Sequence, residues 1–125
     1  MKIIIETIPH KIQRYETVGD YWYDEEGVLQ IRVSEMGNKK YETLVAIHEL
    51  VEQSLTEWNG ITEKEITDFD VEFENNRKEN DLSEPGFESN SPYKIQHYFA
   101  TSVELAMCAL AGIDWKQYDE AVNQL

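Results

Sequence analysis

The chain has little of what anchors or cross-links many small proteins. Its 125 residues include one cysteine, Cys108, so no internal disulfide can form. No apolar run approaches the roughly 20 residues that a membrane-spanning helix needs. Residues 1–6 have neither the apolar core nor the small-residue cleavage site of a signal peptide. We therefore expect a cytoplasmic protein that does not enter membranes.

Positive charge is also scarce. Eleven lysines and arginines stand against 25 aspartates and glutamates, which gives a formal net charge of −14. Such a chain is repelled by nucleic acid and by anionic lipid, so neither is an expected partner. The excess acid favours solubility, and the alternative is a surface that mimics nucleic acid and occupies a basic protein. No phosphate-binding glycine loop and no Cys-x-x-Cys pair is present.

The hydrophobic content predicts a folded core. Hydrophobic residues make up 41% of the chain, with three Trp, seven Tyr and four Phe. A chain of this length suits one domain, residues 1–125.

The first third of the chain predicts strands. Residues 2–7 indicate a first strand, and residues 20–23 and 28–33 indicate a β-hairpin. In the second arm of that hairpin a period-2 alternation marks a half-buried strand, with apolar residues at Leu29, Ile31 and Val33.

Helices follow the strands. We expect a helix over 40–58, a second that begins at the capping box Thr62-Glu63-Lys64-Glu65, a third over 93–111 and a short last one after Asp114. This order predicts an α+β fold: a small antiparallel β-sheet, made of the N-terminal strand plus the hairpin, packed against three or four helices. Residues 77–92 form the single long loop, of a length that is often functional or mobile.

The most informative motif is His-Glu-x-x-Glu in the middle of helix 40–58. His48 and Glu52 are four residues apart, so they share a helix face and could bind one metal ion. Imidazole and carboxylate are ordinary zinc ligands, and a catalytic zinc commonly has three protein ligands plus water. Glu49 would be the general base that takes the proton from that water. We expect a divalent metal, zinc first, with manganese and iron as alternatives.

A third ligand has to come from another element. Helix 93–111 offers His97 and Glu104, seven residues apart on one face, and we rank His97 first, Glu104 second and Asp68 third. Glu104 would be a fourth ligand or a carboxylate that orients a histidine. If His97 and Glu104 both face helix 40–58, the set of ligands would be oxygen-rich and could hold two metal ions. The alternative is an ordinary His–Glu pair on a solvated helix face.

The remaining candidates are weaker. The aromatic run Tyr21-Trp22-Tyr23 suits packing or a partner surface. Together with Arg14 and Arg32 it could form a pocket for a nucleotide-like ligand. His10 is expected in a solvated loop, and Cys108 is expected to pack as a small apolar residue.

Two resemblances extend this interpretation. Residues 45–52 resemble the metal-binding helix of zincin-like metallopeptidases, which carries a histidine where this chain has Glu52. That resemblance implies hydrolysis of a peptide or another amide or ester. Most of the chain looks like a set of small, uncharacterised bacteriophage and prophage proteins, which implies a phage origin but no reaction. The stretches that carry this second resemblance are 6–10, 13–15, 17–22, the 48–52 motif, 69–70, 97–101 and Glu104.

Two functional hypotheses follow. The first is a phage-encoded small metal-binding protein, acting as a zincin-like metal-dependent hydrolase on a peptide or similar substrate. The second is a non-catalytic acidic phage accessory protein that binds or inhibits a host or phage protein. The second hypothesis predicts a complex that dissociates as salt rises, because salt screens charge.

Overall fold

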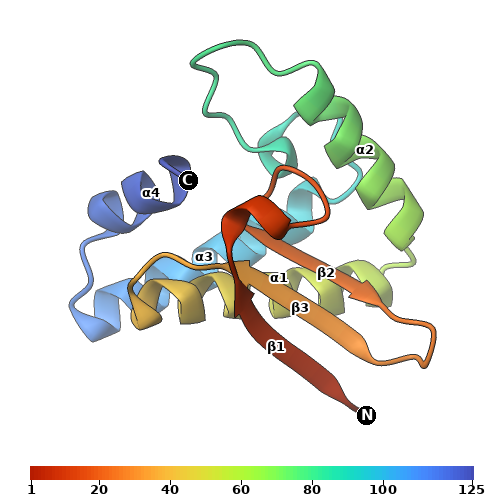
Figure 1. Cartoon of the computed structure of the whole chain (residues 1–125), viewed down its shortest axis with the longest axis horizontal. Helices are drawn as coiled ribbons and strands as arrows, with labels where there is room; N and C mark the ends of the chain where they lie inside the picture. The colour runs from red at the N-terminus through yellow and green to blue at the C-terminus, as the bar shows by residue number, and fades with distance from the viewer.

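The structure, a computed structural model, describes residues 1–125 and confirms the α+β prediction. Three strands come first in the chain and four α-helices follow (Figure 1). The elements are β1 (Ile3–Ile8), β2 (Gly19–Tyr23), β3 (Leu29–Ser34), α1 (Lys39–Trp58), α2 (Glu63–Asn75), α3 (Lys94–Ala111) and α4 (Trp115–Asn123), with 3₁₀ turns η1 (His10–Ile12) and η2 (Pro85–Phe87). No helix combines the length and the apolar character needed to cross a membrane.

The sheet is mixed, so the prediction of an antiparallel sheet is wrong for its first strand. The strand order is β1-β3-β2, with β2 antiparallel and β1 parallel to the central β3. Residues 9–18 connect the end of β1 to β2, which is not the neighbour of β1 in the sheet. The hairpin then places β3 between β1 and β2. Alternation in sequence predicts which face of a strand is buried, but not which strand becomes its neighbour.

The sheet buries one face against α1. Leu29, Ile31 and Val33 of β3 are buried as their alternation predicts, and they share a core cluster with Leu44 and Val45 of α1. α3 packs on α1, on α4 and on η2 rather than forming its main contacts with the sheet. Helix α1 therefore lies between the sheet and α3.

The helix ends follow local sequence signals. Asn38 caps α1 by accepting hydrogen bonds from two backbone N–H groups, and Thr62 and Glu65 form the predicted capping box of α2. Asp114 caps α4, and Gly112 ends α3 in the left-handed region at φ 68°. The predicted helices are confirmed, with boundaries shifted by one residue where they differ.

The buried face of α1 is more polar than its apolar stripe predicts. The stripe consists of apolar residues at spacings of three and four, namely Leu44, Ile47, Val51, Leu55 and Trp58. The buried face includes Leu44 but also His48, Glu52 and Thr56, whereas Trp58 is exposed. The His-Glu-x-x-Glu motif thus lies in the interior between α1 and α3 and not on a solvated flank.

Candidate metal centre

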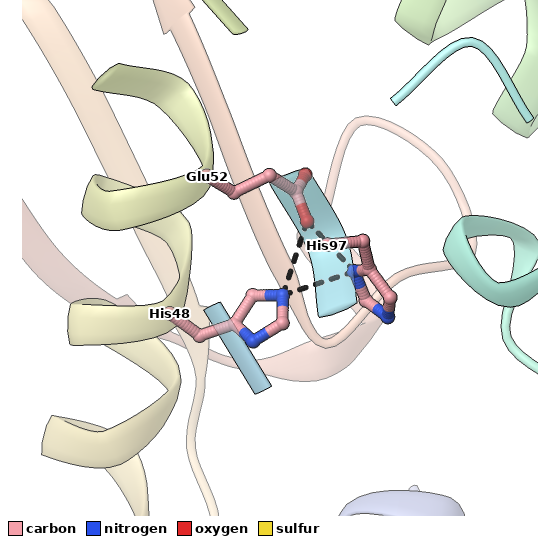
Figure 2. A group of neighbouring side chains, drawn as sticks. All are labelled: His48, Glu52 and His97. Carbon is pink, nitrogen blue, oxygen red and sulfur yellow. Dashed lines mark hydrogen bonds and ion pairs between the residues drawn. The ribbon is translucent and has the colours of Figure 1, made fainter. Parts of the chain in front are cut away.

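Three side chains from two helices converge on one point (Figure 2). His48 Nε2 lies 3.1 Å from Glu52 Oε2 and 3.1 Å from His97 Nδ1, and His97 Nδ1 lies 2.7 Å from the same Glu52 oxygen. Donor atoms around a tetrahedral zinc, with bonds of about 2.0–2.1 Å, are separated by about 3.3 Å. The observed triangle needs only a small expansion to reach that geometry, and the three residues could hold a metal ion.

The outer nitrogen of each imidazole faces a carboxylate. Nδ1 of His48 is bonded to Glu104, and Nε2 of His97 lies 2.8 Å from Glu84. A proton on each outer nitrogen leaves the inner nitrogen with a lone pair directed into the triangle. Carboxylates in this position commonly fix the tautomer and the orientation of metal-binding histidines. Glu104 therefore lies outside the three-donor group, in the orienting position, one of the two roles that its spacing allowed.

Two tyrosines hold the carboxylates in place. Tyr21 of β2 donates a hydrogen bond of 3.0 Å to Glu52 Oε1, which leaves Oε2 for the triangle. Tyr118 of α4 donates one of 2.5 Å to Glu104 Oε2. The sheet and the last helix thus both position the centre.

The charges of the cluster stabilise one another in the interior. Burial alone would raise the pKa of Glu52, but His48 and His97 outweigh it and lower that pKa to about 2. Burial would lower the pKa of His97, yet Glu52 and Glu84 raise it to about 9. The pKa of His48 is also raised, because Glu104 and Glu52 outweigh its burial. A divalent cation would take the place of the protons that these imidazoles share with the carboxylates.

Glu49 lies next to the triangle with a different environment. Its carboxylate packs against Gly19, where a Cβ atom would lie 2.3 Å from Glu49 Oε1. Burial, and after it the charge of Glu52, raises the pKa of Glu49 well above its ordinary value. Glu49 accepts no hydrogen bond from another side chain. A carboxylate with a raised pKa at the edge of a cleft is suited to accept a proton.

The centre opens into a cleft of about 570 Å³. His48, Glu49, Glu52 and His97 all line it, together with aromatic side chains from three other parts of the chain. Arg77 is the only lysine or arginine in the lining, which contains many carboxylates. The cleft can therefore admit a neutral or cationic ligand more readily than an anionic one.

The sequence contains no motif for three residues of the loop before α3 that contact His97. Glu84 bonds His97, and Gly86 packs so closely on the His97 ring that a Cβ atom there would lie 2.3 Å from it. Phe87 adds an edge-on ring contact, with centroids 4.5 Å apart. The single signal was the length of loop 77–92, which marked the segment but none of its residues.

Other predicted candidates lie apart from the centre. Asp68 is exposed and paired with Lys64, so it supplies no third ligand. His10 is bonded to Ser34 at 2.8 Å and to Glu16 at 3.0 Å, and it forms no hydrogen bond with either of the other two histidines.

The residues considered for a nucleotide-like pocket contact one another. Trp22 lies between two guanidinium groups, those of Arg14 and Arg32. Arg14 is held by Asp20 and Arg32 by Glu6, so both cations are already paired.

A second buried carboxylate lines the same cleft. Asp70 of α2 accepts hydrogen bonds from the hydroxyls of Tyr15, at 3.2 Å, and Tyr93. Burial raises its pKa to about 7, because neutral hydroxyls compensate a buried charge less than imidazolium does. Asp70 is therefore a hydrogen-bonded structural group and not part of the three-donor set.

No protein-family model, curated protein or solved structure matches this chain. The resemblances to zincin-like metallopeptidases and to phage proteins therefore stay predictions. What can be said of the site rests on its own geometry.

Proposed function

We propose that this protein binds one divalent metal ion, zinc in the first place, through His48, Glu52 and His97, and that it is a metal-dependent hydrolase. The main observation in support is that both ring nitrogens of each histidine have a defined partner. Their inner nitrogens meet at Glu52, while their outer nitrogens face Glu84 and Glu104. A helix-surface His–Glu pair needs neither burial nor a carboxylate behind each ring.

The ligand set suits hydrolytic chemistry. Two histidines and one glutamate leave a fourth position open, which is a common arrangement for catalytic zinc and is also used for iron. Zinc held in this way lowers the pKa of a bound water to about 7. Glu49 lines the same cleft as the three donors, and it would accept the proton of the attacking water and return it to the leaving amine or alcohol. A peptide or another amide or ester is the substrate class that this chemistry serves.

Metal content tests the centre directly. The protein is purified without an affinity tag and measured by inductively coupled plasma mass spectrometry, beside His48→Ala and Glu52→Ala. We expect nearly one metal per wild-type chain and almost none in either variant. His10→Ala is the matched control, because this histidine lies outside the cluster, and it should keep its metal. Full metal retention in His48→Ala would sink the proposal.

Glu49→Gln separates metal binding from catalysis. The amide cannot accept the proton, so hydrolysis should fall by about 10²–10⁴-fold while the metal content stays at the wild-type level. Screening uses small amide and ester substrates, because the cleft does not select one of them. Hydrolysis unchanged in this variant would remove Glu49 from the general-base role.

The acidic cleft favours a second candidate function. With a net charge of −14 and one arginine in the cleft lining, the protein could bind a basic segment of a host or phage protein without catalysis. That complex should dissociate as salt rises. Wild-type protein that takes up neither zinc nor manganese would favour this function over hydrolysis.

A further inference from the structure

Helix α3 carries two faces of opposite character. The face that packs on α1 contains His97 and Glu104, together with Ala100 and Cys108, and is buried. The opposite side, which we call the outer face of α3, consists of Ile95, Phe99, Ser102, Ala106 and Leu110, all exposed. Ile95 is 79% exposed, Phe99 56% and Leu110 94%. Large apolar side chains in a continuous exposed row are typical of an interaction surface.

The outer face is also free of charge in a highly charged protein. Between Ile95 and Ala111 the only charged or titratable residues of the carboxylate, lysine, arginine or histidine type are His97 and Glu104, and both are buried. Elsewhere the chain carries the acid that gives it a net charge of −14. A basic partner would be drawn to that acid, and it would gain nothing from an uncharged face. A second copy of the chain can approach here without placing carboxylates against carboxylates.

The spacing along the helix makes this face complementary to itself. Its residues recur at intervals of three and four, as in helices that pack side by side. In an antiparallel pair centred between Ser102 and Val103, Phe99 of one copy lies opposite Ala106 of the other, and Ile95 lies opposite Leu110. The large ring of Phe99 then meets the small Ala106, and the aliphatic side chains of Ile95 and Leu110 meet each other. Both copies use the same patch, as a twofold axis requires.

We propose that the outer face of α3 pairs with the same face of a second copy, so that the protein is a twofold-symmetric dimer. The dimer contact and the metal centre use opposite sides of one helix, so this inference does not depend on the proposed hydrolysis. Because both copies are acidic, dimerisation should strengthen as salt screens their repulsion. A complex with a basic protein would show the opposite dependence on salt.

Sedimentation equilibrium of the untagged protein tests the proposal. Wild type should show twice the mass of the chain, with tighter association at physiological salt than at low salt. Phe99→Glu and Leu110→Glu each place two carboxylates in the contact, one from each copy, and should give monomers with unchanged circular dichroism and metal content. The control is Ile5→Glu on β1, which alters a residue that is 51% exposed and far from α3 in sequence, and it should remain dimeric.

Three outcomes would overturn the proposal of a dimer through the outer face of α3. Wild type could be a monomer at every concentration, the two α3 variants could remain dimeric, or Ile5→Glu could dissociate as readily as Phe99→Glu. The second outcome would place the contact on another surface, and the third would indicate non-specific apolar association.

Discussion

Two buried carboxylates line the same cleft and behave in opposite ways. Glu52 is 4% exposed and Asp70 is 7% exposed, so burial opposes the charge of both. Glu52 faces two imidazoles and its pKa falls to about 2, whereas Asp70 faces two tyrosine hydroxyls and its pKa rises to about 7. Burial alone therefore does not identify a ligand. The partners decide whether a buried acid remains an anion that can bind a cation.

The largest expected effect is on the pH dependence of stability, through Asp70→Asn. Its pKa is raised from an ordinary 3.8 to about 7 in the folded chain. The unfolded chain loses this proton near pH 4. The protonated Asp70 therefore contributes its full share to the free energy of unfolding below pH 4, and this contribution is lost as pH rises to 7. The loss is roughly 1.4 kcal/mol per pH unit, on the order of 4 kcal/mol in all. Asparagine cannot titrate, so the variant should lack this fall.

Urea unfolding of both proteins at several pH values measures that difference. Titration of the other groups is common to the two proteins and cancels in the comparison. A constant gap in unfolding free energy between pH 4 and 7 would mean that Asp70 is ionised throughout and that the contrast with Glu52 is wrong.

A smaller effect is expected on zinc affinity from Glu104→Gln. The amide no longer offers His48 Nδ1–H a charged acceptor, and loss of such an orienting carboxylate typically weakens metal binding by about 10–100-fold. Competition with a chromophoric chelator measures the affinity. Asp70→Asn provides the comparison, since its carboxyl bonds only tyrosines, and its affinity should equal that of wild type. Equal affinities in all three proteins would leave Glu104 with a packing role only.

The smallest effect is expected from a pair of glycine substitutions. A Cβ atom at residue 86 would lie 2.3 Å from the His97 ring, and one at residue 19 would lie 2.3 Å from Glu49 Oε1. Gly86→Ala should displace a ligand and weaken zinc binding by several-fold, about 1 kcal/mol. Gly19→Ala should displace Glu49, the proposed general base, and so lower the proposed hydrolysis while leaving zinc affinity unchanged. The same chelator competition and substrate assay measure both variants, and a reversed pattern would contradict the assigned roles.

The sequence predicted the elements more completely than their arrangement. Alternation in β3, the capping box at Thr62 and the glycine at 112 each act over a few residues, and these elements form where expected. The parallel pairing of β1 was missed, because it depends on how residues 9–18 cross the end of the sheet. That crossing depends on the whole chain and has no local signature.

Part of the candidate centre was predictable because it depends on spacing within one helix. Helix spacing placed His48 beside Glu52, and ranking histidine above carboxylate selected His97 as the third donor. Glu84 lies in an irregular loop, where neither a period nor a motif marks a residue that reaches the centre. The outer face of α3 shows the limit of apolar periodicity. Its apolar residues recur at helical spacing, which predicts a buried face, but they are exposed, and the buried side of the helix carries His97 and Glu104.

The three residues proposed to bind the metal come from two helices, and Glu52 and His97 are 45 positions apart in the sequence. This separation has a consequence for the lifetime of the folded chain. The single cysteine rules out an internal disulfide that would tie these helices together. A metal bound by residues of both helices would link them reversibly. It would raise the free energy of unfolding by about 2.7 kcal/mol when free metal is at 100 times its Kd. Bound metal would then slow unfolding and shield α1 and α3 from proteases. Metal supply in the cell would govern how long each copy of the protein survives.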